Sequence, residues 1–171
     1  MGIPAPAVAA TTTTIGTGGS LNDFVNAVNT AQAGDIIEIV GSGDPLNPRV
    51  IQLTQTLNVN PGTTIRGVAA DPALLLKSEQ IEIRAPASAP AFRVLGPGTV
   101  NANGTPGTGA VFIESLEITG ADDRRATGGA IGVDAGAALI LRKVSLNKNK
   151  ANDGGGIHNA GTTYVYDSVF Y

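Results

Sequence analysis

A helical stripe near the N-terminus is the first clear pattern in the chain. Four apolar residues follow the i, i+3, i+4, i+7 spacing of one helix face: Leu21, Phe24, Val25 and Val28. Ser20 precedes the stripe as an N-cap, and Asp23 completes a capping-box pattern with it. Gly34 follows closely enough to end the helix. These signals predict a short amphipathic helix over residues 20–32.

Beyond Gly34 the pattern changes to short apolar runs rich in β-branched residues. The runs cover residues 36–40, 50–53, 64–66, 81–83 and 92–94. Gly, Pro and Asn cluster between the runs, for example in Asn60-Pro61-Gly62 and in Gly96-Pro97-Gly98. Short strands separated by such residues are typical of an all-β chain.

The last third of the chain contains an internal repeat. Gly128-Gly129-Ala130-Ile131 recurs as Gly154-Gly155-Gly156-Ile157, an offset of 26 residues. Residues 112–118 match 140–146 at an offset of 28, and residues 138–146 match 163–171 at an offset of 25. A repeat of this length made of β-runs excludes helical arrays such as ankyrin repeats. It predicts a solenoid in which each turn of chain stacks its strands on the turn before.

The repeat segments GGAI and GGGIHNAG, with the earlier segments AQAGDIIEIVGSG and PGTTIRGV, resemble the right-handed parallel β-helix of the pectate-lyase-like superfamily. They are most similar to repeats of bacterial surface and polymorphic outer-membrane-type proteins. The resemblance implies one all-β domain over residues 20–171, with about five or six coils and an N-terminal cap helix. Residues 1–19 are expected to form a flexible lead.

Composition describes the core and limits the partners. The chain has 23 glycines, 10 prolines, four phenylalanines, three tyrosines and no tryptophan, so stacked aliphatic side chains must fill the interior. A net charge of −3 offers no concentrated basic surface for nucleic acid. No apolar run reaches the ~18 residues of a membrane-spanning helix. The absence of cysteine excludes disulfides and thiolate zinc sites.

Four cations between positions 142 and 150 form the first candidate binding site: Arg142, Lys143, Lys148 and Lys150. A groove lined by them suits an acidic polysaccharide, although the sequence shows no aromatic platform for sugar rings beside it. A structural charge ladder is the alternative, because the repeat places Glu114 beside Arg142 and Glu117 beside Ser145. Opposite charges on neighbouring strands stabilise a sheet modestly.

Other residues with candidate chemistry favour structural roles. His158 is the only histidine, and without an acidic partner in the sequence it is a weak general base. Asp122-Asp123 and Asp153 fall in equivalent turns, where carboxylates suit Ca²⁺. Arg124 and Arg125 compete for the paired aspartates, so we predict no cofactor and keep Ca²⁺ as the weaker alternative.

Aromatic residues crowd the end of the chain: Tyr164, Tyr166, Phe170 and Tyr171. The offset of 25 aligns Tyr164 and Tyr166 with inward-facing Leu139 and Leu141, and aligns Phe170 with an outward position. A β-helix normally ends in a cap. We therefore expect either a truncated chain or a last coil that a partner covers, and the four aromatics predict a homodimer interface there.

Together these patterns favour a structural or adhesive function over catalysis. They predict a non-catalytic module of a secreted or cell-surface bacterial protein, with a polysaccharide or a cell-surface component as partner. The alternative is a polysaccharide lyase or glycosidase-like enzyme that acts on an acidic glycan, because the superfamily contains both kinds of protein.

Overall fold

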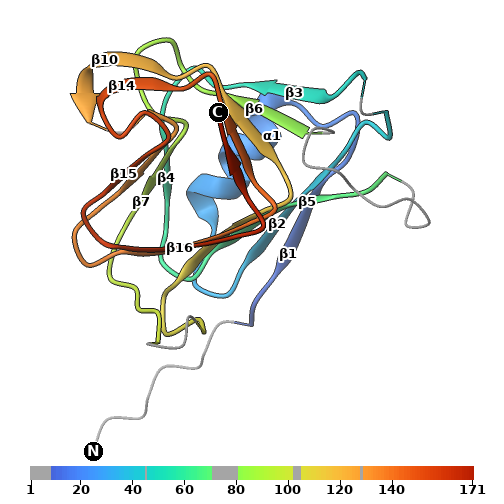
Figure 1. Ribbon diagram of the computed structural model, residues 1–171. Helices are drawn as coiled ribbons and strands as arrows, with labels where there is room; N and C mark the ends of the chain where they lie inside the picture. Colours follow the sequence, from blue (N-terminus) through green and yellow to red (C-terminus); the bar gives the residue numbers. More distant parts are fainter. Residues whose placement is uncertain (1–8, 45, 71–80, 102–104, 128) are drawn as a thin grey trace, which may run out of the picture.

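The protein is a parallel β-solenoid of about five turns, as the computed structural model shows (Figure 1). The structure describes residues 9–44, 46–70, 81–101, 105–127 and 129–171, and for residues 122–127 it describes the backbone alone. Every strand pairing in the three main sheets is parallel. The predicted parallel β-helix is confirmed.

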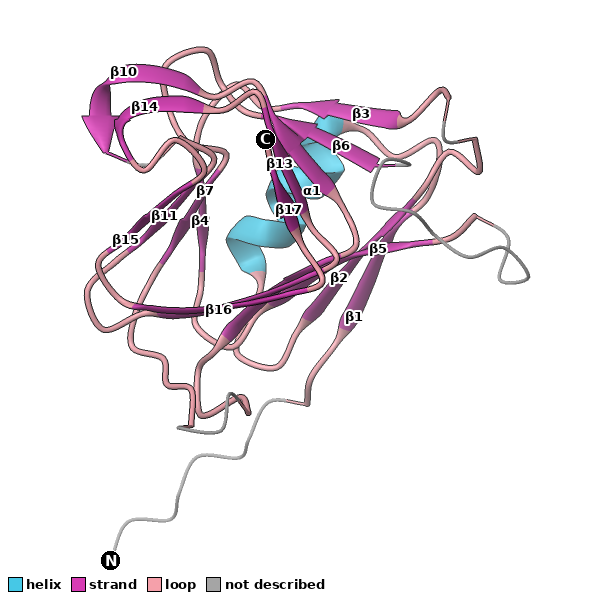
Figure 2. Ribbon diagram, viewed as in Figure 1, coloured by secondary structure: helices cyan, strands magenta, loops and turns pink. Residues whose placement is uncertain are grey.

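Each full coil contributes one strand to each of three sheets, which form the sides of the ring in Figure 2. Sheet A contains β1 (Thr12–Ile15), β2 (Ile36–Val40), β5 (Thr64–Val68), β8 (Val111–Glu114), β12 (Ala138–Arg142) and β16 (Thr162–Tyr166). Sheet B contains β3 (Arg49–Gln52), β6 (Ile81–Arg84), β9 (Glu117–Thr119), β13 (Ser145–Asn147) and β17 (Val169–Phe170). Sheet C contains β4 (Leu57–Val59), β7 (Phe92–Val94), β11 (Ile131–Val133) and β15 (Ile157–Asn159). A fourth, two-stranded sheet pairs β10 (Asp122–Thr127) with β14 (Lys150–Asp153).

The interior consists of side-chain stacks that run through successive coils, because alternate residues of a strand face the same side of a sheet. The sheet A stack is Ile37, Ile65, Ile113, Leu141 and Val165. The sheet B stack is Ile51, Ile83, Ile118, Leu146 and Phe170. The sheet C stack is Leu57, Phe92, Ile131 and Ile157. Aliphatic residues dominate these stacks, as the composition predicts.

The last coil has a register different from the predicted one. Tyr164 pairs with Ile140 and Tyr166 with Arg142, an offset of 24 rather than 25. The turn between sheets C and A has four residues at 134–137 but only two at 160–161, so the offset falls from 26 in sheet C to 24 in sheet A, one residue away from the predicted register. A one-residue shift reverses the face of every side chain in a strand. Both tyrosines therefore face outward, and Phe170, which pairs with Leu146, faces inward.

The helix α1 (Leu21–Thr30) closes the N-terminal end of the solenoid, where Figure 2 shows it behind the ring of coils. Its capping box is present: the Ser20 N–H donates to Asp23 at 2.7 Å, and the Asp23 N–H donates to the Ser20 hydroxyl at 3.3 Å. Phe24 is fully buried and meets Phe92 edge to face, with ring centroids 6.4 Å apart. The predicted cap helix is confirmed, although it ends at Thr30 rather than at residue 32. Within the described ranges, no helix has the length and apolar character needed to cross a bilayer.

The expectation of a flexible lead over residues 1–19 is wrong for Thr12–Ile15, which form β1 beside β2. Two polar residues hold this strand in place. Asp35 accepts hydrogen bonds from the N–H and the hydroxyl of Thr11, at 2.7 and 2.8 Å. The half-buried guanidinium of Arg49 donates to three backbone carbonyls, those of Ile15, Gly19 and Val40. Residues 1–8 lie outside the described part of the chain.

Acid should loosen this attachment through Asp35. Hydrogen bonds from the Gln32 N–H and then from Thr11 lower the pKa of the Asp35 carboxyl. A lowered pKa in the folded protein means that the ionised carboxylate stabilises the fold above about pH 3.9, the unfolded value, and that this stabilisation is lost as the pH falls through the folded pKa. Asp35→Asn should therefore reduce the melting temperature at pH 7 but leave it nearly unchanged at pH 2. Circular dichroism melts across this range would contradict the assignment if the two proteins differed equally at every pH.

Candidate functional site

The outer face of sheet C carries a gap in an otherwise polar row of side chains. Asn58, Arg93, Gly132 and His158 lie in register on β4, β7, β11 and β15. Because neighbouring strands are about 4.8 Å apart, the backbones of Arg93 and His158 are about 10 Å apart across Gly132. A Cβ atom at Gly132 would meet no heavy atom within 4 Å. The missing side chain therefore leaves a slot between two hydrogen-bonding groups.

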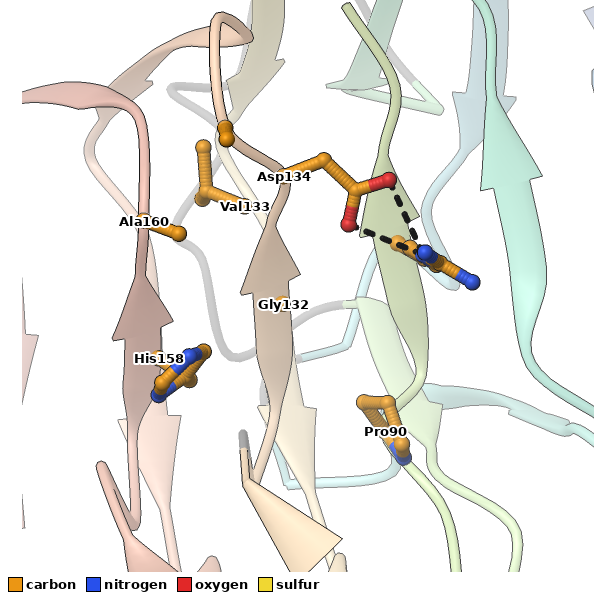
Figure 3. A pocket seen from close by; sticks show the side chains of 8 residues that line it. Pro90, Gly132, Val133, Asp134, His158 and Ala160 are labelled. Carbon is orange, nitrogen blue, oxygen red and sulfur yellow. Dashed lines mark hydrogen bonds and ion pairs between the residues drawn. The ribbon is translucent and has the colours of Figure 1, made fainter.

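This slot belongs to a pocket of about 320 Å³, which we call the Gly132 pocket (Figure 3). The pocket is lined by residues of three neighbouring coils: Pro90, Arg93, Gly132, Val133, Asp134, Ala135, His158 and Ala160. The Arg93 Nε–H donates to both carboxylate oxygens of Asp134, at 2.9 and 3.1 Å. Figure 3 shows the His158 ring on the opposite side of Gly132 from this ion pair.

The Gly132 pocket contains one positive and one negative side chain, Arg93 and Asp134, which form an ion pair. The hydrogen bond with Asp134, and then its charge, raises the pKa of Arg93, so the guanidinium stays protonated. Within the described part of the chain, the His158 imidazole makes no side-chain hydrogen bond, so its ring nitrogens are available to a ligand. Pro90 and Ala160 add small apolar surfaces. The pocket therefore combines fixed donors and acceptors with apolar patches, as small-molecule sites do.

Proton transfer is poorly supported by this arrangement. A general base needs a pKa near the working pH, and Asp134 moves the pKa of Arg93 in the opposite direction. A catalytic histidine is usually oriented by a carboxylate, but both oxygens of Asp134 accept from Arg93.

A second depression, of about 480 Å³, lies on the outer face of sheet B. Glu82 and Glu117 are neighbours in register there, a pair of carboxylates of the kind that glycosidases use. However, Arg84 donates to both oxygens of Glu82, at 2.8 and 3.0 Å, and Thr119 donates to it at 2.7 Å. The Arg84 hydrogen bond lowers the pKa of Glu82. A glycosidase general acid needs a raised pKa, so Glu82 does not fit that role.

The four candidate cations do not gather in one groove. Arg142 lies on the outer face of β12, and Lys143 follows it at the corner between sheets A and B, with a φ of +52°. Lys148, at the next corner, lines the sheet B depression, and Lys150 begins β14. The structure therefore brings together Arg142 and Lys143 and leaves the two other lysines apart.

The repeat correctly predicts the charged neighbours. Arg142 pairs in register with Glu114, and their side chains approach to 3.8 Å. Glu117 pairs with Ser145. The ladder on sheet A is longer than expected, since Glu38, Arg66, Glu114 and Arg142 alternate in charge over four adjacent strands.

The expectation that no aromatic platform accompanies Arg142 is wrong. The guanidinium carbon lies 5.8 Å from the ring centroid of Phe112 and 5.6 Å from that of Tyr166. Tyr164 stacks on Tyr166 with centroids 6.4 Å apart and ring planes 15° apart. The repeat does not predict this cluster, because an offset of 25 for the last coil turns both tyrosines inward.

The four aromatics of the predicted interface divide between two surfaces. Tyr164 and Tyr166 lie half-buried on the outer face of sheet A. Phe170 and Tyr171, 46% and 80% exposed, lie on the last coil, which also exposes Val165 and Val169. The homodimer interface stays a prediction.

Two of the three acidic residues considered for Ca²⁺, Asp122 and Asp123, lie outside the set whose side chains the structure describes. Within that set, no group of three or more His, Cys, Asp or Glu residues is placed to hold an ion. Asp122 and Asp123 pair through their backbones with Lys150 and Ala151. The Ca²⁺ alternative therefore stays a prediction.

Comparisons with known proteins leave the family open. No protein-family model matches the sequence, and no curated protein matches it. The resemblance to the pectate-lyase-like superfamily and to outer-membrane-type repeats stays a prediction, whereas the parallel β-solenoid is observed directly.

Proposed function

We propose that the chain is a non-catalytic, glycan-binding β-helix module with a structural or adhesive role in a secreted or cell-surface bacterial protein. The observation that carries this proposal is the slot at Gly132, with the Arg93–Asp134 ion pair on one side and His158 on the other. The backbones of Arg93 and His158 are held in one sheet, on the two strands that flank β11, and this favours binding by reducing the ordering cost.

The ligand class follows from the charges in the pocket. The charges of Arg93 and Asp134 cancel, so the site neither attracts a polyanion nor repels a neutral molecule. A carboxylate and a guanidinium can each engage adjacent hydroxyl groups of one sugar ring, and Pro90 and Ala160 can contact its C–H faces. A volume of about 320 Å³ is at the small end of ligand sites. These features support an uncharged sugar unit of a polysaccharide as the ligand.

The experiment that tests this function combines binding and turnover. We expect isothermal titration calorimetry to detect binding of at least one neutral probe among cellohexaose, mannohexaose and maltohexaose. We also expect no rise in ultraviolet absorbance with polygalacturonate, alginate or chondroitin, with or without Ca²⁺, and no new reducing ends from any of the six glycans. Product formation would establish the lyase or glycosidase alternative, and a failure to bind any of the neutral probes would refute the proposed function.

A further inference from the structure

One arginine differs from the others in how its hydrogen-bonding groups are used. The structure describes the side chains of five arginines: Arg49, Arg66, Arg84, Arg93 and Arg142. Arg49 donates to backbone carbonyls, and the next three donate to carboxylates. The Arg142 guanidinium donates no hydrogen bond to any described residue, and its nearest carboxylate oxygen, on Glu114, is 3.8 Å away. That separation is too long for a hydrogen bond.

The side chain of Arg142 is nevertheless held in place. Phe112 on β8 and Tyr166 on β16 flank β12, and their ring centroids lie 5.8 and 5.6 Å from the guanidinium carbon. Cation–π contacts of this kind orient a guanidinium without using its N–H groups. The side chain is 48% exposed, so its planar set of donors is both oriented and accessible to solvent.

The surroundings of Arg142 favour a negatively charged ligand group. Arg142 and Lys143, with Glu114 and Ser115, line a depression of about 300 Å³ at the edge of sheet A. Within this lining, the two cations and the single carboxylate leave one net positive charge, and Asp167 lines a neighbouring depression with Lys143. A guanidinium pairs with a carboxylate or a sulfate through two parallel hydrogen bonds, and this is the geometry that Arg142 leaves unused.

We propose that Arg142 and Lys143 form a binding site for one anionic oxygen group, a carboxylate or a sulfate ester, of an acidic glycan. Tyr164 and Tyr166 lie next to Arg142 on the same face. Their aromatic rings can stack on the sugar ring that carries the anionic group. The inference goes beyond the proposed function, since it concerns another sheet, a charged ligand and residues that do not line the Gly132 pocket.

Two hexasaccharide probes distinguish the sources of the anion: hexagalacturonate carries carboxylates alone, and a κ-carrageenan hexasaccharide carries sulfate esters alone. We expect the wild-type protein to bind at least one of them in calorimetry at low salt. Arg142→Gln should weaken that binding at least tenfold. Arg142→Lys keeps the charge but loses the planar pair of donors, and it should weaken binding by a smaller factor.

Arg66→Gln is the matched control, because Arg66 lies on the same ladder but its Nε–H already donates to Glu38 at 3.0 Å. It removes the same charge and should change affinity less than twofold. Gly132→Val should leave acidic binding intact, which separates this site from the Gly132 pocket. Equal losses in the Arg142 and Arg66 variants, or no binding of either probe by the folded wild-type protein, would overturn the inference.

Discussion

Replacing Phe92 with alanine should lower the free energy of unfolding by about 3–5 kcal/mol, the usual cost of removing a fully buried phenylalanine. Phe92 lies in the sheet C stack between Leu57 and Ile131 and has no exposed surface. It also meets Phe24 of the cap helix edge to face, and such pairs add to the burial term. One substitution therefore removes core volume and weakens the attachment of α1. Urea denaturation followed by circular dichroism measures the change.

Phe112→Ala is the matched control for this prediction. Phe112 has the same side chain on a neighbouring coil, but it lies half-buried on the outer face of sheet A. We expect it to cost less than half as much as Phe92→Ala. Equal costs for the two substitutions would contradict the placement of Phe92 in the central stack.

Filling the slot at Gly132 should abolish binding of the neutral glycan and leave the fold intact. Valine is favoured in strands, and a Cβ atom at this position meets open space. In Gly132→Val the new side chain would occupy the space between Arg93 and His158, so we expect affinity to fall at least tenfold with no decrease in melting temperature. Calorimetry with the neutral probe that the wild-type protein binds gives the measurement.

Asn58→Val controls for a general effect of valine on this face. Asn58 occupies the same outward row, next to Arg93 but outside the pocket lining. Its substitution should change affinity less than twofold. If Gly132→Val bound the neutral glycan as tightly as the wild type, the ligand would have to lie elsewhere.

Much of the fold follows from local sequence signals. Ser20 and Asp23 mark the start of the cap helix, since a capping box needs only residues three apart. The recurrence of Gly-Gly-x-Ile gives the pairing of β11 with β15, because neighbouring coils of a solenoid repeat the same local structure. The same repeat places Glu114 beside Arg142.

What the sequence could not predict depends on turn lengths and on distant contacts. The turn before β16 is two residues shorter than its counterpart, which sets the offset of β16 at 24. The offset of 25 expected from the sequence differs from this by one residue, and a one-residue error places Tyr164 and Tyr166 on the wrong face. The anchoring of β1 depends on Arg49, which lies 34 residues beyond the Ile15 carbonyl that it binds. No local pattern indicates such a contact.

Only part of the candidate site could be predicted from the sequence. His158 stands out as the single histidine, and the repeat already aligned it with Gly132. Arg93 lies on a coil whose sequence departs from the repeat, and 41 residues separate it from Asp134. Its place beside Gly132 therefore required the three-dimensional structure.

The central claim is that the outer face of sheet C binds a neutral glycan at the Gly132 pocket. Titration of ¹⁵N-labelled protein with the bound neutral hexasaccharide, followed by two-dimensional NMR, locates the ligand without assuming its position. We predict that the largest amide shifts fall on Arg93, Gly132, Asp134, His158 and Ala160, with the far side of the solenoid unchanged. Shifts confined to sheets A and B, or none at saturating glycan, would contradict the claim.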